Sequence, residues 1–582
     1  MMFDILAKTY EELEANSKRL HKTFIISELL KKTKESDLST IILLLQGRVF
    51  LETDKQELGV AAKLVVKAIS VATGYSAANI EDQWKKTGDL GEVAEKFIGK
   101  KQQGILFSED LSVKIVFDTF RKLAVLEGHG SVDQKVKMIA KLLSIAKPIE
   151  AKYIIRIALQ DLRVGVAQGT LRDAIAWAYL EEINPNYDKA TESINPENRE
   201  EYTKKMNIIQ DALNKTTDFV KTAIHARKGI DSLKSIKIEV GKPLKVMLAQ
   251  KVTTVEDAFE TVGRPAALEY KYDGFRMQIH KNNDEVTIYT RRLENVTAQF
   301  PEVKKYVLDN VRAKTCILDC EAAGYDSKTR KYTPFQSISQ RIKRKYDIEK
   351  LARELPVELN IFDVLYWDGE ELLNTPFKKR RDIIEKIVIR KEKKIVISKM
   401  LITDDSKKAQ LFFEESVENG NEGLMFKNMD GIYKPGSRVG YMIKLKSAMD
   451  PLDVVIIGAE WGQGKRNGWF TSFNIAIESE GEFLEIGNVG TGLKEKKEEG
   501  LSFEELTELL KPLIIEEKGR VVRFKPSVVI SVEYEEIQKS PGYSSGYALR
   551  FPRVTTLRSD RMSEDVATLE DVEDLFFTQR KS

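Results

Sequence analysis

Cysteine and histidine are scarce in this chain of 582 residues, which holds two cysteines and four histidines. A zinc site built from four cysteines is therefore excluded. The two cysteines, Cys316 and Cys320, lie in the apolar segment 316–320. We interpret them as buried thiols, and a disulfide is the alternative if the geometry allows one.

Long apolar runs and a strong net charge are also missing. No run approaches the roughly 20 apolar residues of a membrane span, and residues 1–4 do not open an apolar signal segment. We expect an intracellular monomer without membrane contact. Because the net charge is only +3, any nucleic-acid surface has to come from local clusters of cations.

The length suggests about three domains, and the first, residues 1–235, has helical patterning. Val136, Ile139 and Leu143 follow Ser131 at spacings of three and four, which predicts a helix with Ser131 as its cap. Pro148 should stop that helix. Strand patterns are scarce here, so we expect an all-α domain.

The patterning changes near residue 236. Ile236, Ile238 and Val240 alternate with charged residues, which predicts a strand. Up to residue 447 we expect a mixed α+β domain, with buried strands at 285–290, 316–322 and 358–364 and a helix at 380–389.

A further change at 447–451 predicts a third domain, residues 448–582. Short strands separated by glycine-rich turns surround one predicted helix at 503–510. This pattern is typical of a small Greek-key barrel such as an OB-fold. The predicted strands are 454–458, 470–477, 483–489 and 528–534.

Charged residues interrupt the apolar strands of the middle domain, where they are costly unless used or paired. Lys271 is followed by an acid, a glycine and Arg276. A deprotonated lysine can attack phosphorus and form a phosphoramide with a nucleotide. The other residues in such places are Arg291, Glu321, Phe362, Glu422, Lys444 and Lys446.

This set suits phosphoryl transfer. Lys444, Lys446, Arg276 and Arg291 are cations that could hold a triphosphate, and nearby cations would favour the neutral form of Lys271. Glu321 and Glu422 offer hard oxygen ligands for Mg²⁺. They could equally be ion-pair partners of lysines, and Phe362 could be ordinary core.

Over nearly its whole length, the chain resembles ATP-dependent DNA ligases of the archaeal and eukaryotic type. The ordered motifs that carry the resemblance are EYKYDG (269–274), TRRLE (290–294), LDCE (318–321), FDVLY (362–366), EGLMFK (422–427), KLK (444–446) and LRFPR (549–553) followed by RSDR (558–561). The resemblance implies sealing of nicks in duplex DNA, with ATP and Mg²⁺ or Mn²⁺, in replication, repair and recombination. For an archaeal protein it implies a cytoplasmic, nucleoid-associated location.

The resemblance also implies roles for individual residues. Lys271 would carry AMP, Glu269 would contact the adenine edge and Phe362 would stack on the ring. Arg276, Arg291 and Glu321 would hold the ribose and phosphate region, and Glu321 and Glu422 the metal. Lys444 and Lys446, with Arg438, would hold the α-phosphate. Arg558, Asp560 and Arg561 would close over the pyrophosphate, although Arg561 departs from the family's usual lysine.

Outside these motifs, three features are weaker. Arg156 and Arg163 of the helical domain are candidate DNA-backbone contacts, with a solvated helix face as the alternative. Gln103, Ile105, Leu106 and Phe107 resemble a degenerate sliding-clamp peptide, or simply pack on the domain. Gly462–Arg466 lacks the spacing of a phosphate loop and is interpreted as a barrel turn.

Three competing functions share part of this pattern. An RNA ligase or an RNA-capping guanylyltransferase would use the same lysine motif, but a large helical domain argues against both. An NAD-dependent ligase would need a cysteine-rich zinc module. A DNA-binding scaffold without activity would not need the set around Lys271.

Overall fold

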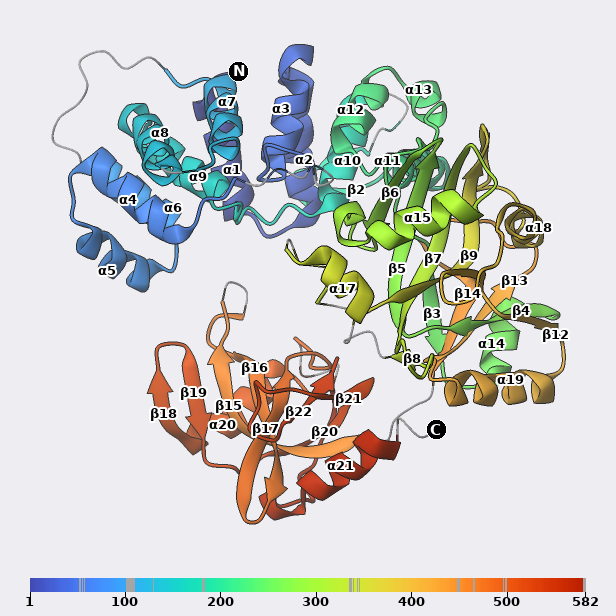
Figure 1. Ribbon diagram of the computed structural model, residues 1–582. Coiled ribbons are helices and arrows are strands. Elements are labelled where there is room, and N and C mark those ends of the chain that lie inside the picture. Colours follow the sequence, from blue (N-terminus) through green and yellow to red (C-terminus); the bar gives the residue numbers. More distant parts are fainter. Residues whose placement is uncertain are drawn as a thin grey trace.

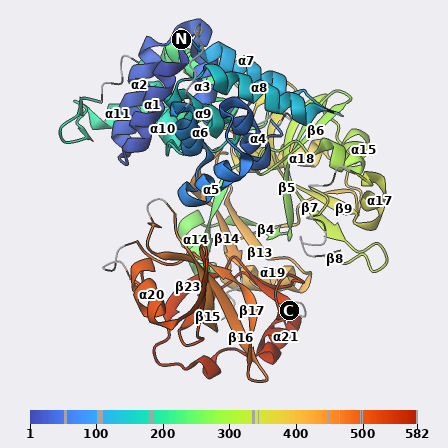
Figure 2. The ribbon, with the colours of Figure 1, turned by 90° about the vertical axis from the view of Figure 1, so that its left-hand side faces the viewer.

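The computed structural model describes residues 1–578 except 52–53, 55, 57, 101–109, 129, 181–182, 184, 334–337, 339, 343, 345, 447–450, 464–465, 496 and 498–499. It has a helical region, a middle region with two sheets and a C-terminal barrel (Figures 1 and 2). The predicted fold class is confirmed. The candidate clamp peptide and most of the linker at 447–451 lie outside the described residues.

The helical region has one continuous apolar core that runs from Phe3 to Ile236. In α7, Ser112 caps the first turn, and Val116, Phe120 and Leu123 are buried at helical spacing. The helices are α1 (Phe3–Ala15), α2 (Arg19–Lys32), α3 (Glu35–Leu45), α4 (Ala62–Thr73), α5 (Ala77–Thr87), α6 (Leu90–Gly99), α7 (Val113–Ala124), α8 (Ser131–Ile145), α9 (Pro148–Ala158), α10 (Gln168–Tyr179), α11 (Arg199–Thr216), α12 (Phe219–Arg227) and α13 (Ile230–Lys234), with a hairpin of β1 (Tyr187–Asp188) and β2 (Ser193–Ile194).

Helix α8 ends at Ile145, before Pro148, as predicted, and Pro148 begins α9, where its missing N–H needs no partner. Two other local predictions in this part of the chain were wrong. The cap position of α8 is Gly130, so Ser131 is the first helical residue. Residues 236–240 form no strand, although Ile236 and Ile238 are buried. Their alternation reflects an extended connector that packs on both regions, because burial can alternate without a hydrogen-bonded neighbour strand.

Two sheets form the middle region. One has the order β10-β9-β7-β5-β6, with β11 added beside β9 and β8 beside β7. The other has the order β12-β4-β13-β14-β3. The strands are β3 (Leu248–Val252), β4 (Ala266–Lys271), β5 (Gly274–Asn282), β6 (Glu285–Thr290), β7 (Thr315–Tyr325), β8 (Tyr332–Thr333), β9 (Val357–Trp367), β10 (Glu370–Glu371), β11 (Ile395–Ile397), β12 (Met400–Thr403), β13 (Gly423–Asn428) and β14 (Arg438–Lys446).

Helices cover these sheets and complete separate apolar cores. Phe259 of α14 and Phe412 of α19 pack with β4 and β13, whereas Ile384 of α18 packs with β7 and β9. Cys316 and Cys320 are free and buried in β7, as predicted, and burial raises the pKa of the Cys316 thiol to about 12. The helices are α14 (Val255–Val262), α15 (Pro301–Asn310), α17 (Ile348–Glu354), α18 (Phe377–Ile387) and α19 (Ser406–Glu418).

The C-terminal region is a small barrel with its own core. Its main sheet has the order β17-β16-β15-β19-β18, and β20 joins β15 to β23. Helix α20 (Phe503–Leu510) has the predicted limits, and α21 (Leu569–Thr578) packs on the outside. The strands are β15 (Leu452–Trp461), β16 (Phe470–Ser479), β17 (Glu482–Val489), β18 (Ile514–Lys518), β19 (Val521–Phe524), β20 (Val529–Glu533), β21 (Glu536–Lys539), β22 (Tyr547–Arg550) and β23 (Arg553–Leu557).

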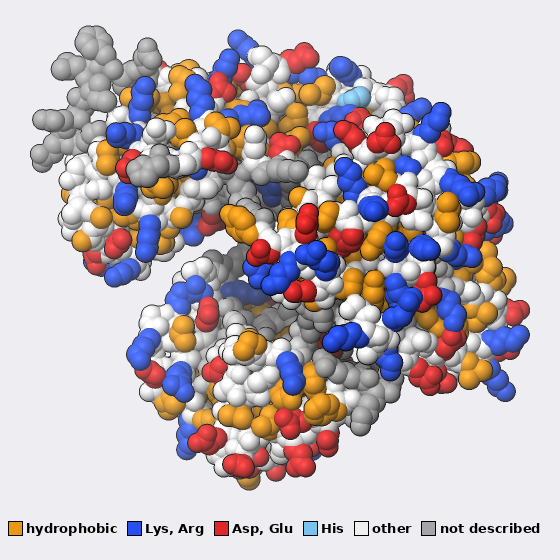
Figure 3. All heavy atoms as spheres, viewed as in Figure 1, with side chains coloured by type: hydrophobic (Ala, Val, Ile, Leu, Met, Phe, Trp, Pro, Cys, Tyr) orange, Lys and Arg blue, Asp and Glu red, His pale blue; other side chains and the backbone are white. Residues whose placement is uncertain are grey.

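The surface in Figure 3 is hollowed between the helical region and the barrel, which face each other across the left side of the molecule. The sheets of the middle region join the two at the right. Within the described ranges, no helix combines the length and apolar character that crossing a membrane requires.

Candidate functional site

A pocket of about 770 Å³ lies between the two sheets of the middle region, and the barrel forms part of its rim. Neighbouring strands place side chains in rows along its floor. Lys271 of β4 and Lys446 of β14 both pair with Gly423 of β13. One step along, Glu269 and Lys444 both pair with Met425. Since alternate residues of a strand share a face, all four charged groups point into the pocket.

Lys271 lies at the end of β4, where it meets a carboxylate. Its Nζ is 2.6 Å from Oε2 of Glu422, and Nζ of Lys446 is 2.5 Å from the same oxygen. Burial opposes the charge of Glu422, but Lys271 and Lys446 overcome it and hold its pKa at about 2. The ion pair that was the alternative interpretation of Glu422 is therefore present, and it includes Lys271 as well as Lys446.

Lys444 differs from Lys446 in its surroundings. Burial, with the charges of Lys446 and Lys271, lowers the pKa of Lys444. Lys446 also lies 3.1 Å from Glu535 of the barrel, and the two carboxylates raise its pKa against the effect of burial. The two lysines at the end of β14 thus concentrate positive charge beside Lys271. An anionic ligand bound there would stabilise this charge.

Glu321 of β7 faces the same space from the other sheet, opposite Arg276 in the β5–β7 register. Burial raises its pKa to about 8, and the nearby cations Lys271 and Arg276 only partly offset that effect. Gly274 makes this approach possible. A Cβ at Gly274 would lie 2.3 Å from the Ala322 carbonyl oxygen, so only glycine lets β5 approach β7 beside the lysine.

Glu269 closes the inner end of the pocket. It is 1% exposed, and its carboxylate is held by Arg381 of α18 at 2.6 Å and Lys427 of β13 at 2.5 Å. The half-buried ring of Phe362 lies next to it, with Lys427 Nζ 4.8 Å from the ring centroid. A carboxylate fixed by two cations beside an aromatic face can accept hydrogen bonds from the edge of a stacked base.

Arg276 lies in the pocket wall, but its guanidinium is hydrogen-bonded to other residues of the protein. Its guanidinium binds Asp319 through Nε at 2.8 Å and Nη2 at 2.5 Å, and donates to Met247 O at 2.8 Å. The hydroxyl of Tyr433 donates to the same Asp319 at 2.8 Å. Arg276 therefore lies in a buried network, from which its cation reaches the Phe362 ring at 5.3 Å.

Arg291 and Arg438 line the rim of the pocket, and both are exposed. Arg291 follows β6, and Arg438 begins β14, where the pairing with β3 shifts register before Ile443. Their positions leave both side chains at the mouth of the pocket.

The structure does not bring Arg558, Asp560 and Arg561 to the pocket. Arg558 binds Asp453 of β15 at 2.6 Å and Asp560 at 2.8 Å, and Arg561 lies 3.8 Å from Asp453. This segment is therefore tied to its own barrel in the present arrangement.

Other barrel residues occupy the rim instead, namely Glu535, Arg550 and Phe551. Arg550 lies 4.0 Å from Asp273, next to the lysine motif, and 2.8 Å from Glu536. The sequence motif at 549–553 had marked this turn, but not its contact with Asp273. Arg381 and Lys427 were also missed as site residues. The available signal was a buried-strand acid at Glu269, which needs a cationic partner.

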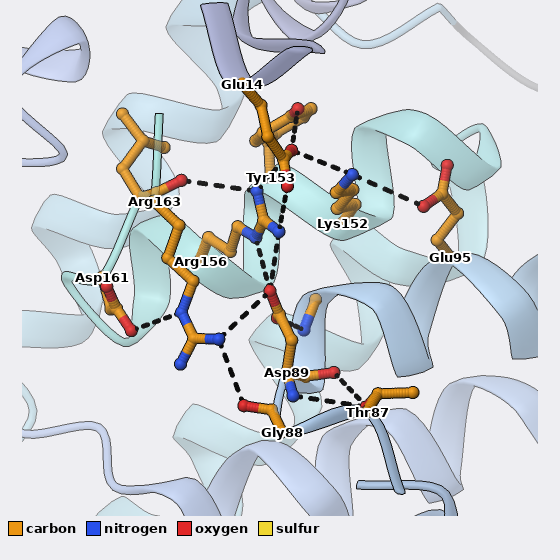
Figure 4. A network of polar contacts seen from close by, with 12 residues as sticks. Glu14, Thr87, Gly88, Asp89, Glu95, Lys152, Tyr153, Arg156, Asp161 and Arg163 are labelled. Carbon is orange, nitrogen blue, oxygen red and sulfur yellow. Dashed lines mark hydrogen bonds and ion pairs between the residues drawn. The ribbon is translucent and has the colours of Figure 1, made fainter. Parts of the chain in front are cut away.

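Figure 4 shows the surroundings of Arg156 and Arg163 in the helical region. Arg156 is 2% exposed and binds Glu14 at 2.8 Å and Asp89 at 2.6 Å, so the prediction that it contacts DNA was wrong. Arg163 is exposed, binds Asp161 at 2.7 Å and donates to Gly88 O at 3.1 Å. Its DNA contact stays a prediction.

Comparison with known proteins gives a consistent result along the chain. Family models match it as the DNA ligase N terminus over residues 2–176, the ATP dependent DNA ligase domain over 246–446 and the ATP dependent DNA ligase C terminal region over 466–561. The solved structure titled "Pmar-Lig_PreS3" is 17% identical, covers 95% of this chain with 99% of its own, and has a TM-score of 0.57, which supports the fold.

Curated relatives match over the full length. The DNA ligase of Nanoarchaeum equitans is 47% identical and that of Thermococcus fumicolans 42%, each covering 100% of this chain and 99% of the relative. The DNA ligase of Archaeoglobus fulgidus is 38% identical with the same coverage. The chain therefore belongs to the family of ATP-dependent DNA ligases.

Proposed function

We propose that Lys271 is the residue through which this ATP-dependent DNA ligase carries AMP to a nick. The observation that supports this role is the position of Lys271 in the pocket, where it shares the Glu422 carboxylate with Lys446 and lies near Lys444. The enzyme has the family's general roles in DNA replication, repair and recombination.

Three phosphoryl transfers make up the proposed reaction. Nζ of Lys271 loses its proton and attacks the α-phosphorus of ATP, and the bond to the β-phosphate breaks to release pyrophosphate. An oxygen of the 5′-phosphate then attacks the AMP phosphorus, and the P–N bond breaks to restore the lysine. Finally the 3′-hydroxyl oxygen attacks the 5′-phosphorus, and AMP leaves with the electron pair of the P–O bond.

The adenine would lie between Phe362 and the Glu269 carboxylate. Arg381 and Lys427 hold the Glu269 carboxylate in place, and a carboxylate accepts hydrogen bonds, which suits the amino group of adenine. Phe362 offers the face for stacking. Arg276 would hold this wall in place through Asp319, and it could meet the ribose from there.

Lys444 and Lys446 would hold the α-phosphate, with Arg291 and Arg438 nearer the mouth. Their fixed positive charge would stabilise the negative charge that spreads over the phosphoryl oxygens in the transition state. An anion that binds Lys446 would also compete with Glu422 for that lysine.

Glu321 and Glu422 fit a Mg²⁺ or Mn²⁺ ion. Mg²⁺ usually takes one or two carboxylates and completes its shell with waters and nucleotide phosphates. Glu321 and Glu422 fit that pattern, since both carboxylates line the same pocket and each comes from a different sheet or its edge. A bound ion would supply positive charge that neutralises the phosphates.

Sealing also requires DNA, and we propose nicked duplex as the substrate that the enzyme acts on as a monomer. We propose domain limits of 1–235, 236–447 and 448–582, with a hinge at 447–451. Movement about it would exchange Glu535 and Arg550 at the rim for Arg558, Asp560 and Arg561. Binding of a sliding clamp through Gln103–Phe107, and a cytoplasmic, nucleoid-associated location, stay proposals.

The test is labelling with α-labelled ATP and Mg²⁺, followed by a chase with nicked DNA. Wild type should take up label and lose it to sealed DNA, and Lys271→Ala should take up none. Lys251→Ala, an exposed lysine on β3 of the same sheet, is the matched control. Label on Lys271→Ala would show that another residue is the nucleophile.

A further inference from the structure

A second cavity, of about 280 Å³, lies where the helical region meets the middle region, away from Lys271. Helices α10 and α11 form one wall, and the turn before β14 forms the other. An adjoining space of about 300 Å³ shares Gln168, Lys245 and Gly436 with it and reaches Arg291 and Arg292 at the pocket rim. No role in the proposed reaction uses the first cavity.

The charged side chains that line both cavities are all cationic. Arg172 and Lys245 line the first, and Lys245, Arg291 and Arg292 line the second. No carboxylate lines either one among the residues that the structure describes. Arg172 shares Asp173 with Arg19, so this group of three keeps one net positive charge. The first turn of α10 also lines the cavity, and its N-terminal end favours an anion.

Asn214 of α11 gives the cavity a polar anchor. Its side chain is 4% exposed and lines the cavity, and its Oδ1 accepts a hydrogen bond from Gln210 at 2.7 Å. Within the described part of the chain, its Nδ2 donates to no protein group. This amide lines the cavity, so it is placed to donate to a ligand that accepts a hydrogen bond.

The two walls of the cavity are joined by hydrogen bonds. Lys245 Nζ donates to Gln168 Oε1 at 3.0 Å, and Lys245 N donates to Asn214 O at 3.1 Å. Gly436 has φ +69°, and a Cβ there would lie 2.7 Å from Asn214 Oδ1. The junction therefore holds its donors in place before any ligand arrives.

We propose that this junction cavity binds a phosphate group, held by Asn214 Nδ2, Lys245 and Arg172. The ligand chemistry is that of a phosphate oxyanion, whether a phosphodiester of DNA or free inorganic phosphate or pyrophosphate. Because its donors come from two regions of the chain, the bound group favours the arrangement in which the helical region rests on the middle region. This inference does not rest on the role of Lys271.

The test uses the full chain and three variants. Asn214→Asp keeps the shape and the bond from Gln210 but puts a carboxylate in the cavity, and Lys245→Gln removes a charge. Lys141→Gln, an exposed lysine of α8, is the control. Labelling by ATP shows that each variant is folded, and if Asn214→Asp is not, Lys245→Gln carries the test.

Two measurements separate the sources of phosphate. Calorimetry with sodium phosphate and pyrophosphate in EDTA should show at least tenfold weaker binding in both cavity variants if the ligand is free. Anisotropy with nicked duplex should show a salt slope smaller by about 0.9 if one DNA phosphate contact is lost. Weaker binding of free phosphate, a smaller salt slope, or both, in the cavity variants supports the site, provided that Lys141→Gln matches wild type. Cavity variants that match wild type in both measurements would overturn it.

Discussion

Nζ of Lys271 lies 2.6 Å from Oε2 of Glu422, so the proposed nucleophile begins as half of an ion pair. The carboxylate occupies the amino group of the lysine, and attack on phosphorus needs that group free. A ligand that draws Glu422 away would therefore free the lysine for attack. Lys446, on the same oxygen, keeps the carboxylate ionised in the meantime.

Replacing Glu422 with Gln should slow formation of the lysine–AMP adduct by roughly 10²-fold, the scale of one lost electrostatic contact at a reacting centre. It should also raise the Mg²⁺ concentration needed for half-maximal rate. Rapid-quench labelling across a Mg²⁺ series measures both. Glu415→Gln, which removes an exposed partner of Lys399, is the control. An unchanged Mg²⁺ requirement would restrict Glu422 to the ion pair.

Arg381→Met should weaken base recognition, because Glu269 would keep only Lys427 as a cationic partner. We expect the KM for ATP in self-adenylation to rise roughly tenfold, equivalent to about 1.4 kcal/mol. The preference for ATP over GTP should fall with it. Arg390→Met removes an exposed partner of Glu385 and serves as the control. If neither quantity moves, Lys427 alone positions Glu269.

His280 should make stability depend on pH. Its Nδ1 accepts from Gly241 N–H and its Nε2 bonds Gln278 Oε1, so the buried ring is held neutral, and burial lowers its pKa to about 3. The unfolded chain takes up the proton near pH 6.5. Stability is therefore complete above pH 6.5 and falls toward pH 3, by about 2 kcal/mol at pH 5.

Urea-denaturation midpoints at pH 7.5 and 5.0 check this expectation. His280→Asn keeps an acceptor for Gly241 but does not titrate, so its midpoint should fall less than that of wild type. His225→Asn in α12 is the control and should behave like wild type. Equal losses in all three proteins would assign the acid sensitivity to other groups.

Arg156→Met should loosen the helical region, since it removes the buried guanidinium that Asp89 and Glu14 share and leaves them only Arg163 and Lys152 as cationic partners. Breaking such a pair costs about 3–5 kcal/mol, whereas an exposed pair is worth about 0–1 kcal/mol. Hydrogen exchange should therefore speed up in α6 and α9 for Arg156→Met but hardly for Arg163→Met. Similar exchange in the two variants would contradict a structural role for Arg156.

Docking of the barrel rests on polar contacts such as Lys446–Glu535 at 3.1 Å. Glu535→Lys should repel Lys446 and separate the barrel, which small-angle scattering would record as a larger radius of gyration. Glu533→Lys, on the exposed side of β20, should leave the radius unchanged. An unchanged radius in Glu535→Lys would mean that other contacts hold the barrel.

The sequence predicted the strands well where burial alternates with charge. The limits of β6 and α20 agree with the structure, and Lys444 and Lys446 share one face as their spacing required. The connector at 236–240 failed because alternation reports burial and not pairing. Ser131 failed because Gly130, with φ +84°, takes the cap position.

Contacts between distant segments were beyond the sequence pattern. Arg381 is part of a basic run on a helix, which looks like a solvated face, yet it is buried against Glu269 from β4. The sequence pattern also could not show that Arg156 points into the protein, because its partners Glu14 and Asp89 come from α1 and from the start of α6. Likewise, nothing in the motif at 558–561 shows whether the barrel presents it to the pocket or keeps it on Asp453.

Gly274 offers no side chain to a ligand in the pocket, yet the missing side chain sets how near β5 comes to β7. With the Ala322 carbonyl where the first carbon of any side chain would lie, alanine would wedge the strands apart and move Glu321 relative to Lys271. A library of all substitutions across 269–276 should thus tolerate glycine alone at 274. Position 274 would then be as intolerant of substitution as Lys271. The reason at position 274 is the close approach of two backbone strands, whereas at Lys271 it is the chemistry of the side chain.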